Sequence, residues 1–353
     1  MQGWSPDLFR HTMDAPQATS AAMPRPPHTA LRSATALRRR CVLLLGVLGP
    51  WLSGGCSPPA PLRLVGHPWP GHEPFFLAQH LGYLPAQPLL QLQETATLQE
   101  SLQRLRESRA DGAMLPLSDV LQLRDEGLKL QVVLVFDVSR GADMLLMQTG
   151  LRGLSTLRGQ RVAVDPSSQG TLMLQLALEK AGLQAGDVQI ERLPYEQHEL
   201  AWERRDVHAL VTHEPVASRL LARGAYAALD TRQLPDTLFH VLAVRSDVLP
   251  VHGDTLRAAL AGYFQALDYQ RRNPWDAAYR MAPRLRLSAE ALLEAMRGLE
   301  QPDRLDNRRY LADTDSALQR IALQLAPLMQ RAGLLRRPVS LLDLDSGDYL
   351  PRS

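Results

Sequence analysis

Polar and aromatic side chains that can bind a small molecule recur directly after the predicted strands of this chain. Trp69 lies between Pro68 and Pro70, in a segment that can be neither a regular helix nor a central strand. A rigid loop can therefore present its indole as one wall of a ligand slot, by stacking or by a cation–π contact. The alternative is that Trp69 pins the loop to its own lobe. His67 and His72 can bind ligand or cap turns of the same segment.

A serine-rich segment, residues 167–171, precedes a predicted helix. Its backbone N–H groups and hydroxyls can hold a sulfonate, carboxylate or phosphate at the positive end of the helix. Ordinary N-capping is the alternative, and it needs only one of the hydroxyls. The residues that would form this anion cradle are Ser167, Gln169, Gly170 and Thr171.

Carboxylates also follow predicted strands, at Glu73, Asp119, Asp143 and Glu214. Two or more of them in one cleft would favour a cationic or amine-bearing ligand, because buried carboxylates need partners. The alternative is that they start helices and complement the helix dipole, which applies most strongly to Asp119 and also to Glu214 before Pro215. A zwitterion or a polar heterocycle would reconcile the acids with the anion cradle. The predicted ligand contacts are Trp69, His72, Glu73, Ser118, Asp143, Ser167, Gln169, Gly170, Thr171, His213 and Glu214.

The sequence offers no set of residues for catalysis or metal binding. It contains no serine nucleophile elbow, phosphate-binding loop or zinc-type cysteine set. His208 and His213 would lie on opposite faces of one strand, so shared metal ligation is not expected. We therefore predict no catalytic residue, no metal and no cofactor.

These residues must be positioned by alternating strands and helices, a pattern that favours α/β lobes. The run 130–136 is rich in Val and Leu and predicts a strand buried on both faces of a parallel sheet. From residue 254 onward the pattern is helical, with one helix expected near residues 274–281. Thr97 is expected to cap an earlier helix. The other predicted strands are 62–65, 89–93, 113–115, 161–164, 188–193, 209–212 and 225–229. Because ligands in such sheets bind beyond the carboxyl ends of the strands, the polar segments can face one crevice.

The charge balance excludes a nucleic-acid-binding face. The whole chain has 39 basic and 37 acidic residues, but residues 1–55 hold six arginines and only two acids. Residues 56–353 therefore carry a formal charge of −2, whereas a nucleic-acid footprint needs a basic surface. Since Cys41 and Cys56 are the two cysteines, the chain after Cys56 contains no internal cysteine for a disulfide.

The segment from Arg38 to Cys56 has the three parts of a secretory signal: three arginines, the apolar run 41–48 and small residues before a cysteine. The run is much shorter than the roughly 20 residues of a membrane-spanning helix. Because it ends at Cys56, the segment resembles a bacterial lipoprotein signal, although Ser53 occupies the usual leucine position and Leu52 precedes it. The resemblance implies a lipidated Cys56 anchored to a membrane; plain secretion is the alternative. Translation can start at Met1, Met13 or Met23.

The order and spacing of several segments resemble the periplasmic substrate-binding proteins of ABC importers for nitrate, sulfonates, taurine and thiamine precursors. The resemblance covers most of residues 62–330. The segments that carry it are 68–74, 115–119, 133–143, 157–164 and 211–215.

The resemblance implies the type II fold of periplasmic binding proteins, with two α/β lobes, each a mixed sheet flanked by helices, and a hinge cleft between them. The expected divisions are a leader (1–55), a tether (56–61), lobe 1 (62–148 plus 245–335), lobe 2 (149–244) and a C-terminal tail (336–353). It further implies a monomer that captures a small polar ligand in the periplasm and delivers it to an inner-membrane permease and ATPase.

Two alternatives remain open at this point. One is a sensory lipoprotein whose cleft reports ligand occupancy to a signalling partner. The other is an enzyme on the same fold, similar to the thiamine-pyrimidine synthases. Those enzymes carry a cysteine-rich segment, which the chain after Cys56 lacks.

Overall fold

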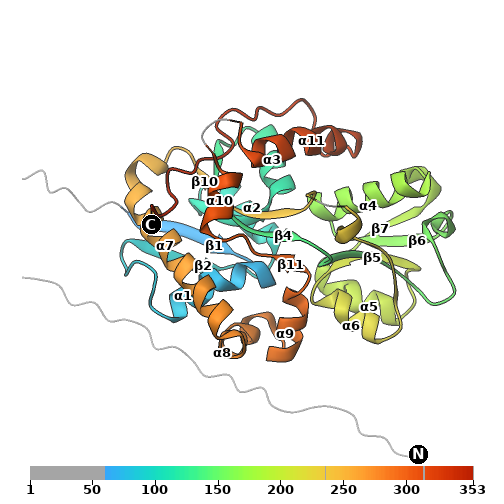
Figure 1. Cartoon of the computed structure of the whole chain (residues 1–353). Helices are drawn as coiled ribbons and strands as arrows, with labels where there is room; N and C mark the ends of the chain where they lie inside the picture. Colours follow the sequence, from blue (N-terminus) through green and yellow to red (C-terminus); the bar gives the residue numbers. More distant parts are fainter. Residues whose placement is uncertain (1–59, 235, 313–314, 353) are drawn as a thin grey trace, which may run out of the picture. The chain divides into compact units, whose positions relative to one another are not determined.

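Two β-sheets, each flanked by helices, organise the chain (Figure 1). The computed structural model describes residues 60–234, 236–312 and 315–352. The predicted α/β fold class with two lobes is confirmed. The predicted leader (1–55) and the lipidation site Cys56 lie outside the described residues.

The first sheet has the strand order β11-β4-β10-β3-β1-β2. Strand β1 pairs in parallel with β2 and β3, whereas β10 runs antiparallel between β3 and β4. The predicted buried strand at 130–136 is confirmed, and it extends to Ser139. The strands are β1 (Leu62–Gly66), β2 (Leu90–Glu94), β3 (Gly112–Pro116), β4 (Leu130–Ser139), β10 (Phe239–Arg245) and β11 (Leu299–Glu300).

The second sheet has the order β7-β6-β8-β5-β9. Strand β6 is parallel to β7 and β8, and β5 lies antiparallel between β8 and β9. The strands are β5 (Asp143–Met147), β6 (Arg161–Val164), β7 (Gln189–Arg192), β8 (Ala209–His213) and β9 (Tyr226–Asp230).

Capping residues fix the helix ends that the sequence pattern only approximates. Thr97 accepts a hydrogen bond from the Glu100 N–H at 3.2 Å and begins α2, as predicted. Gly182, at φ 67°, ends α4 in the left-handed conformation. The α-helices are α1 (Glu73–His80), α2 (Leu98–Arg106), α3 (Leu117–Asp125), α4 (Ser168–Ala181), α5 (His198–Glu203), α6 (Val216–Ala222), α7 (Leu249–Arg272), α8 (Pro274–Met281), α9 (Ala289–Met296), α10 (Arg304–Tyr310) and α11 (Ala317–Arg331).

Strand pairing corrects the predicted lobe boundaries. Residues 143–147 were expected in lobe 1 and residues 239–244 in lobe 2, but β5 belongs to the second sheet and β10 to the first. Lobe 2 therefore spans residues 143–230, and the chain crosses between β4 and β5 and returns between β9 and β10. The sequence pattern indicates a strand but not its neighbours, because pairing depends on residues far away in the chain.

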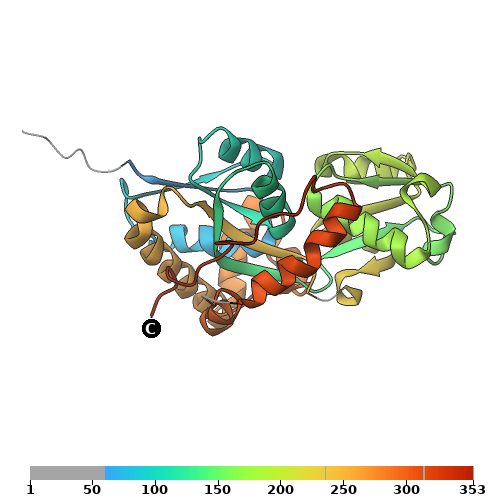
Figure 2. The ribbon, with the colours of Figure 1, turned by 90° about the horizontal axis from the view of Figure 1, so that it is seen from above.

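The expected C-terminal tail is part of lobe 1. The Val132 N–H donates to the Leu344 carbonyl at 2.8 Å, and Leu344 and Leu350 are buried. Helix α11 also reaches lobe 2, where Arg331 pairs with Glu179 of α4 at 3.1 Å (Figure 2). None of the described helices is both long and apolar enough to span a membrane.

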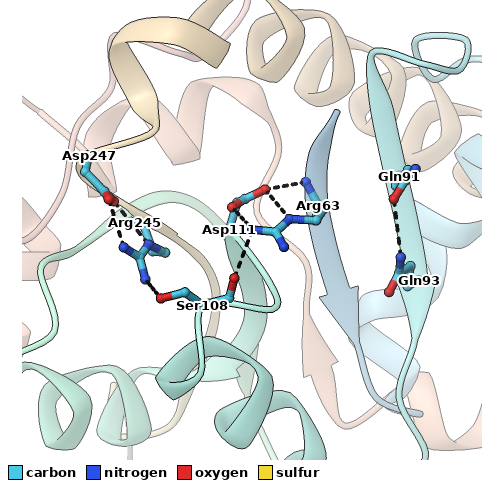
Figure 3. Close-up of polar contacts among 7 residues, drawn as sticks. All are labelled: Arg63, Gln91, Gln93, Ser108, Asp111, Arg245 and Asp247. Atoms are coloured by element: carbon cyan, nitrogen blue, oxygen red, sulfur yellow. Dashed lines mark hydrogen bonds and ion pairs between the residues drawn. The ribbon is translucent and has the colours of Figure 1, made fainter. Parts of the chain in front are cut away.

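A polar network stabilises lobe 1 near the beginnings of β1 and β3 (Figure 3). The segments that line the cleft follow the opposite ends of these two strands. Asp111 accepts hydrogen bonds from the Arg63 backbone N–H at 2.8 Å, from its Nε at 3.0 Å and from its Nη2 at 2.6 Å. Ser108 accepts from Arg63 through its carbonyl and from Arg245 through its hydroxyl. Strands β1, β3 and β10 are thereby joined by side chains as well as by the backbone.

Candidate functional site

A cavity of about 1020 Å3, here called the cleft, is lined by residues of both lobes. It lies where the segments after β1, β3, β6 and β8 converge, as expected for a ligand site at strand ends. Six of the predicted ligand contacts line it: Trp69, Asp143, Ser167, Gln169, Gly170 and His213. The other five, His72, Glu73, Ser118, Thr171 and Glu214, are not among its lining residues.

Trp69 forms a fixed wall of the cleft. Its indole Nε1–H donates to Asp137 Oδ2 at 2.9 Å, and the ring stacks on His240 with 4.1 Å between ring centroids. The other carboxylate oxygen of Asp137 is 3.0 Å from His240 Nδ1. Since a carboxylate only accepts, His240 carries its proton on Nδ1. Asp137 thus pins Trp69 to lobe 1 while the indole still lines the cleft.

Gly71 makes this arrangement possible. A Cβ atom at this position would overlap Asp137 Oδ2 and would lie 2.8 Å from Trp69 Nε1. Any larger residue would therefore displace the carboxylate or the indole. Gly71 lies in the short 3-10 helix Pro70–His72, next to the hydrogen bond between Trp69 and Asp137.

Lobe 2 contributes a second stacked pair. The rings of His213 and Tyr195 are parallel within 3°, with centroids 4.1 Å apart. The His213 Nδ1–H donates to the Glu214 carbonyl at 2.8 Å, and the Tyr195 hydroxyl accepts from the Val216 N–H at 3.3 Å. His213 also meets Trp69 edge to face at 5.2 Å, so aromatic contacts join the two lobes across the cleft.

The serine-rich segment caps α4 and contacts other protein groups. Ser167 Oγ accepts from the Gly170 N–H at 3.0 Å, and Thr171 Oγ1 accepts from Arg192 at 2.6 Å. Gln169 Nε2 donates to Asp143 Oδ1 at 2.8 Å. These bonds favour the capping alternative over the predicted anion cradle, because the hydroxyls are already engaged. The predicted helix 171–181 accordingly begins earlier, at Ser168.

Next to the cleft, α3 of lobe 1 contacts α4 of lobe 2. The Ser168 hydroxyl donates to Gln122 Oε1 at 2.5 Å, and its backbone N–H donates to Asp119 Oδ1 at 3.4 Å. Burial raises the pKa of Asp119 to about 7, although its hydrogen bonds to Ser168 oppose the rise. Asp119 therefore contacts the other lobe, and it also lies in the first turn of α3.

His67 lies at the wall that Trp69 forms, and His72 lies behind this wall. Their rings meet edge to face at 5.0 Å, and His72 Nδ1 is 3.4 Å from the His67 carbonyl oxygen. Burial lowers the pKa of both imidazoles well below 6.5, so both are neutral at physiological pH. His67 lines the cleft, whereas the predicted contact His72 supports it from behind.

Glu73 is buried, pairs with Arg284 and is not among the residues that line the cleft. Burial raises the pKa of Glu73 to about 7, although the Arg284 guanidinium opposes the rise. Arg284 also donates to the Gly66 carbonyl at 2.8 Å and lies 3.5 Å over the Phe76 ring. Glu73 thus holds Arg284, which itself lines the cleft.

Glu214 caps α6 and does not line the cleft. Its carboxylate accepts from the Ser218 N–H at 3.1 Å and from the Ser218 hydroxyl at 2.8 Å. The helix-start alternative therefore holds for Glu214. Ser118 is buried in α3, and its hydroxyl has no hydrogen-bond partner among the described residues.

The sequence interpretation missed four residues that build the cleft: Asp137, Tyr195, His240 and Arg284. His240 lies opposite Asp137 in the β4–β10 pairing, a relationship that local sequence does not show. Tyr195 starts a 3-10 helix shortly after the predicted strand 188–193, so its position offered a signal, whereas Arg284 lies in a 3-10 helix that follows no predicted strand. Within the described ranges, no three His, Cys, Asp or Glu side chains gather as metal ligands.

Several known proteins of similar structure are named for the small molecules that they bind. The structure resembles the periplasmic aliphatic sulphonate binding protein of Escherichia coli, with a TM-score of 0.68 and 19% identity over 81% of this chain and 92% of that one. It also resembles the alkanesulfonate-binding protein of Xanthomonas axonopodis pv. citri (TM-score 0.67, 17% identity, covering 82% and 99%). The nitrate-binding protein of Synechocystis PCC 6803 gives a TM-score of 0.65 at 15% identity, covering 83% and 88%.

Sequence comparison identifies the family. A protein of Brucella abortus (strain 2308) that is named as a binding protein is 22% identical over 137 residues, which span 38% of this chain and 43% of that relative. The match thus covers less than half of the relative's length. A sequence model of the NMT1-like family matches residues 55–283, well over half of the chain. The family resemblance is therefore confirmed, and the chain belongs to the NMT1-like family.

Proposed function

We propose that this protein is the solute-binding component of an ABC importer, capturing a small polar molecule in its cleft and delivering it to a permease and ATPase. One observation carries the proposal: a cavity of about 1020 Å3 is lined by side chains of both lobes. Its volume is at the upper end of the roughly 300–1,000 Å3 of small-molecule sites. Aromatic walls with a few fixed polar groups, as in this cleft, are typical of such sites.

Capture would occur by closure of the two lobes. Among the described residues, the chain passes from one sheet to the other between β4 and β5 and again between β9 and β10. A ligand that contacts both lobes stabilises the closed state, because those contacts are lost when the lobes separate. Micromolar affinity needs about 8 kcal/mol of net binding free energy, which stacking and several hydrogen bonds can supply.

Location in the periplasm and anchoring through Cys56 complete the proposal. The names of the Escherichia coli and Synechocystis proteins with this fold place those proteins in the periplasm. The support for the anchor is the sequence from Arg38 to Cys56. No covalent chemistry is required of the cleft, so we propose a binding protein instead of an enzyme.

The test is binding to the full chain, measured by thermal shift and calorimetry with a panel of sulfonates, amines and pyrimidines. A ligand that binds the folded state raises the melting temperature by mass action. We expect the dissociation constant of the tightest compound to rise at least about tenfold when Trp69→Ala and His213→Ala are combined, a loss of about 1.4 kcal/mol or more. The control is Trp275→Ala, since Trp275 is half-exposed on α8. Equal affinities of the double variant and the control would contradict the proposal.

A further inference from the structure

The two partly buried arginines that line the cleft, Arg219 and Arg284, are both paired with carboxylates. Five carboxylates and three guanidinium groups line it. Arg219 is held by both oxygens of Glu199 at 2.9 and 2.7 Å, and Arg284 is held by Glu73. The third, Arg286, is exposed. A sulfonate or nitrate deep in the cleft would therefore compete with carboxylates for Arg219 and Arg284, although Arg284 Nε has no hydrogen-bond partner among the described residues.

Three of the first N–H groups of α4 are already used within the protein. A free helix N-terminus can bind an anion through its first N–H groups. Here the Gly170 N–H donates to Ser167 Oγ at 3.0 Å, and the Ser168 N–H donates to Asp119 Oδ1 at 3.4 Å. The Thr171 N–H continues the helix by donating to the Ser167 carbonyl at 3.1 Å. These donors are used within the protein.

Two buried hydrogen-bond acceptors in the cleft lie next to each other without a partner in the described part of the chain. Asp143 and Gln169 line the cleft and are 4% and 6% exposed. Asp143 Oδ1 accepts from Gln169 Nε2, and this bond fixes the orientation of the amide. Asp143 Oδ2 and Gln169 Oε1 are then both buried without a hydrogen-bond partner among the described residues. Because an unpaired buried acceptor costs free energy, this pair requires donors from elsewhere.

We infer that the cleft binds an organic cation, a protonated amine or an amidinium, whose N–H groups donate to Asp143 and Gln169. The inference rests on the proposed function and names the class of its ligand. The remainder of the lining indicates an apolar or aromatic body, since it includes Leu98, Met173, Val211, Leu285 and Leu287 beside the stacked rings of Trp69 and His213. An organic cation is thus a different class of ligand from the sulfonates and the nitrate for which proteins with the same fold are named.

The test compares cations with anions of matched shape on the full chain. The probes are benzylamine, benzamidine and tryptamine as cations, benzenesulfonate and nitrate as anions, and benzyl alcohol as a neutral compound. The variant is Asp143→Asn, which keeps a carbonyl oxygen for Gln169 Nε2 and replaces the unpaired oxygen by an amide NH2. The matched control is Glu191→Gln, which removes one negative charge from an exposed position of β7 outside the cleft.

We expect the cations to raise the melting temperature and the anions to leave it unchanged. The dissociation constant of the tightest cation should rise at least about tenfold in Asp143→Asn and change less than about twofold in Glu191→Gln. The melting temperature of each variant without probe verifies that it folds. Cation binding that survives Asp143→Asn would overturn the assignment to this carboxylate.

The two proposals fail in different ways. Stabilisation by the anions alone, lost when Trp69→Ala and His213→Ala are combined, would overturn the ligand class and leave the proposed function standing. A chain that responds to none of these probes, nor to the wider panel of sulfonates, amines and pyrimidines, would overturn both.

Discussion

The indole of Trp69 donates its hydrogen bond to the carboxylate of Asp137 at 2.9 Å, although 68 positions separate the two residues. Asp137 lies in β4 and His240 opposite to it in β10, the two strands that lead to and from lobe 2. The wall of the cleft is therefore attached directly to the strands next to both crossovers.

Replacing Trp69 by phenylalanine should destabilise the protein. The change Trp69→Phe keeps an aromatic ring but removes the only N–H that the indole supplies to Asp137. A hydrogen bond to a charged group contributes about 1.5–3 kcal/mol, so the free energy of unfolding should fall by about 2 kcal/mol in urea titrations. Trp275→Phe, at a half-exposed position, should change it by less than about 0.5 kcal/mol. Equal effects of the two changes would refute this explanation.

Gly71→Ala should lower stability by about 1–3 kcal/mol, because the new methyl group overlaps Asp137 Oδ2 and forces it or the indole to move. Thermal or chemical unfolding measures the loss, and weaker ligand binding should accompany it. The matched control is Gly186→Ala, whose added carbon has no atom within 4 Å. Wild-type stability of the Gly71 variant would show that the segment adjusts without strain.

Asp119 should make stability depend on pH. Burial raises its folded-state pKa from 3.8 to about 7, so the folded chain binds this proton more tightly than the unfolded chain does between these values. The contribution of Asp119 to the free energy of unfolding is therefore largest at low pH. It falls as the pH rises from 3.8 to about 7, by at most about 1.4 kcal/mol per pH unit.

Asp119→Asn removes the ionisation and keeps the shape of the side chain. The difference in unfolding free energy between wild type and Asp119→Asn should thus decline toward pH 7 and stay constant above it. Melting temperatures measured across this pH range provide the comparison. A constant difference at every pH would exclude Asp119 as the titrating group.

Asp111→Ala should reduce stability without affecting ligand binding. The change leaves three Arg63 donors without their acceptor, at the strand ends far from the cleft (Figure 3). We expect a loss of about 2–4 kcal/mol in the free energy of unfolding, since the carboxylate is nearly buried. Asp254→Ala, which removes an exposed partner of Arg257, should cost less than about 1 kcal/mol. A large change in affinity after Asp111→Ala would contradict this separation of roles.

Cys56→Ser should release the protein from the membrane fraction. A thioether to a diacylglycerol requires the cysteine sulfur, and serine cannot replace it. Metabolic labelling with radioactive palmitate should mark the wild-type chain and not the variant. Cys41→Ser is the control, because Cys41 lies within the apolar part of the predicted signal. Equal labelling of both variants would place the lipid elsewhere.

Local signals predicted much of the fold. The Thr97 cap, the buried strand from Leu130 and the helix Pro274–Met281 are all confirmed. These features depend on residues close together in the chain: a side-chain oxygen three positions before an N–H, a run of β-branched residues, or a proline at a helix start.

The rest of the fold and of the cleft depends on contacts between segments that are far apart in the chain. The predicted boundary left β5 in lobe 1 because its sequence does not show that it pairs with β8 and β9. His240 and Arg284 are held at the cleft by partners that include Asp137 and Glu73, which are 103 and 211 positions away. Glu214 appeared to be a ligand contact because an acid after a strand can equally face a cleft or cap the next helix.

Strand pairing places the two ends of lobe 2 next to each other. Met144, near the start of β5, lies opposite Asp230 at the end of β9. Lobe 2 is thus a continuous insertion whose two ends enter and leave at neighbouring strands. A fluorescent protein inserted at this junction would report the proposed closure of the lobes as an optical signal.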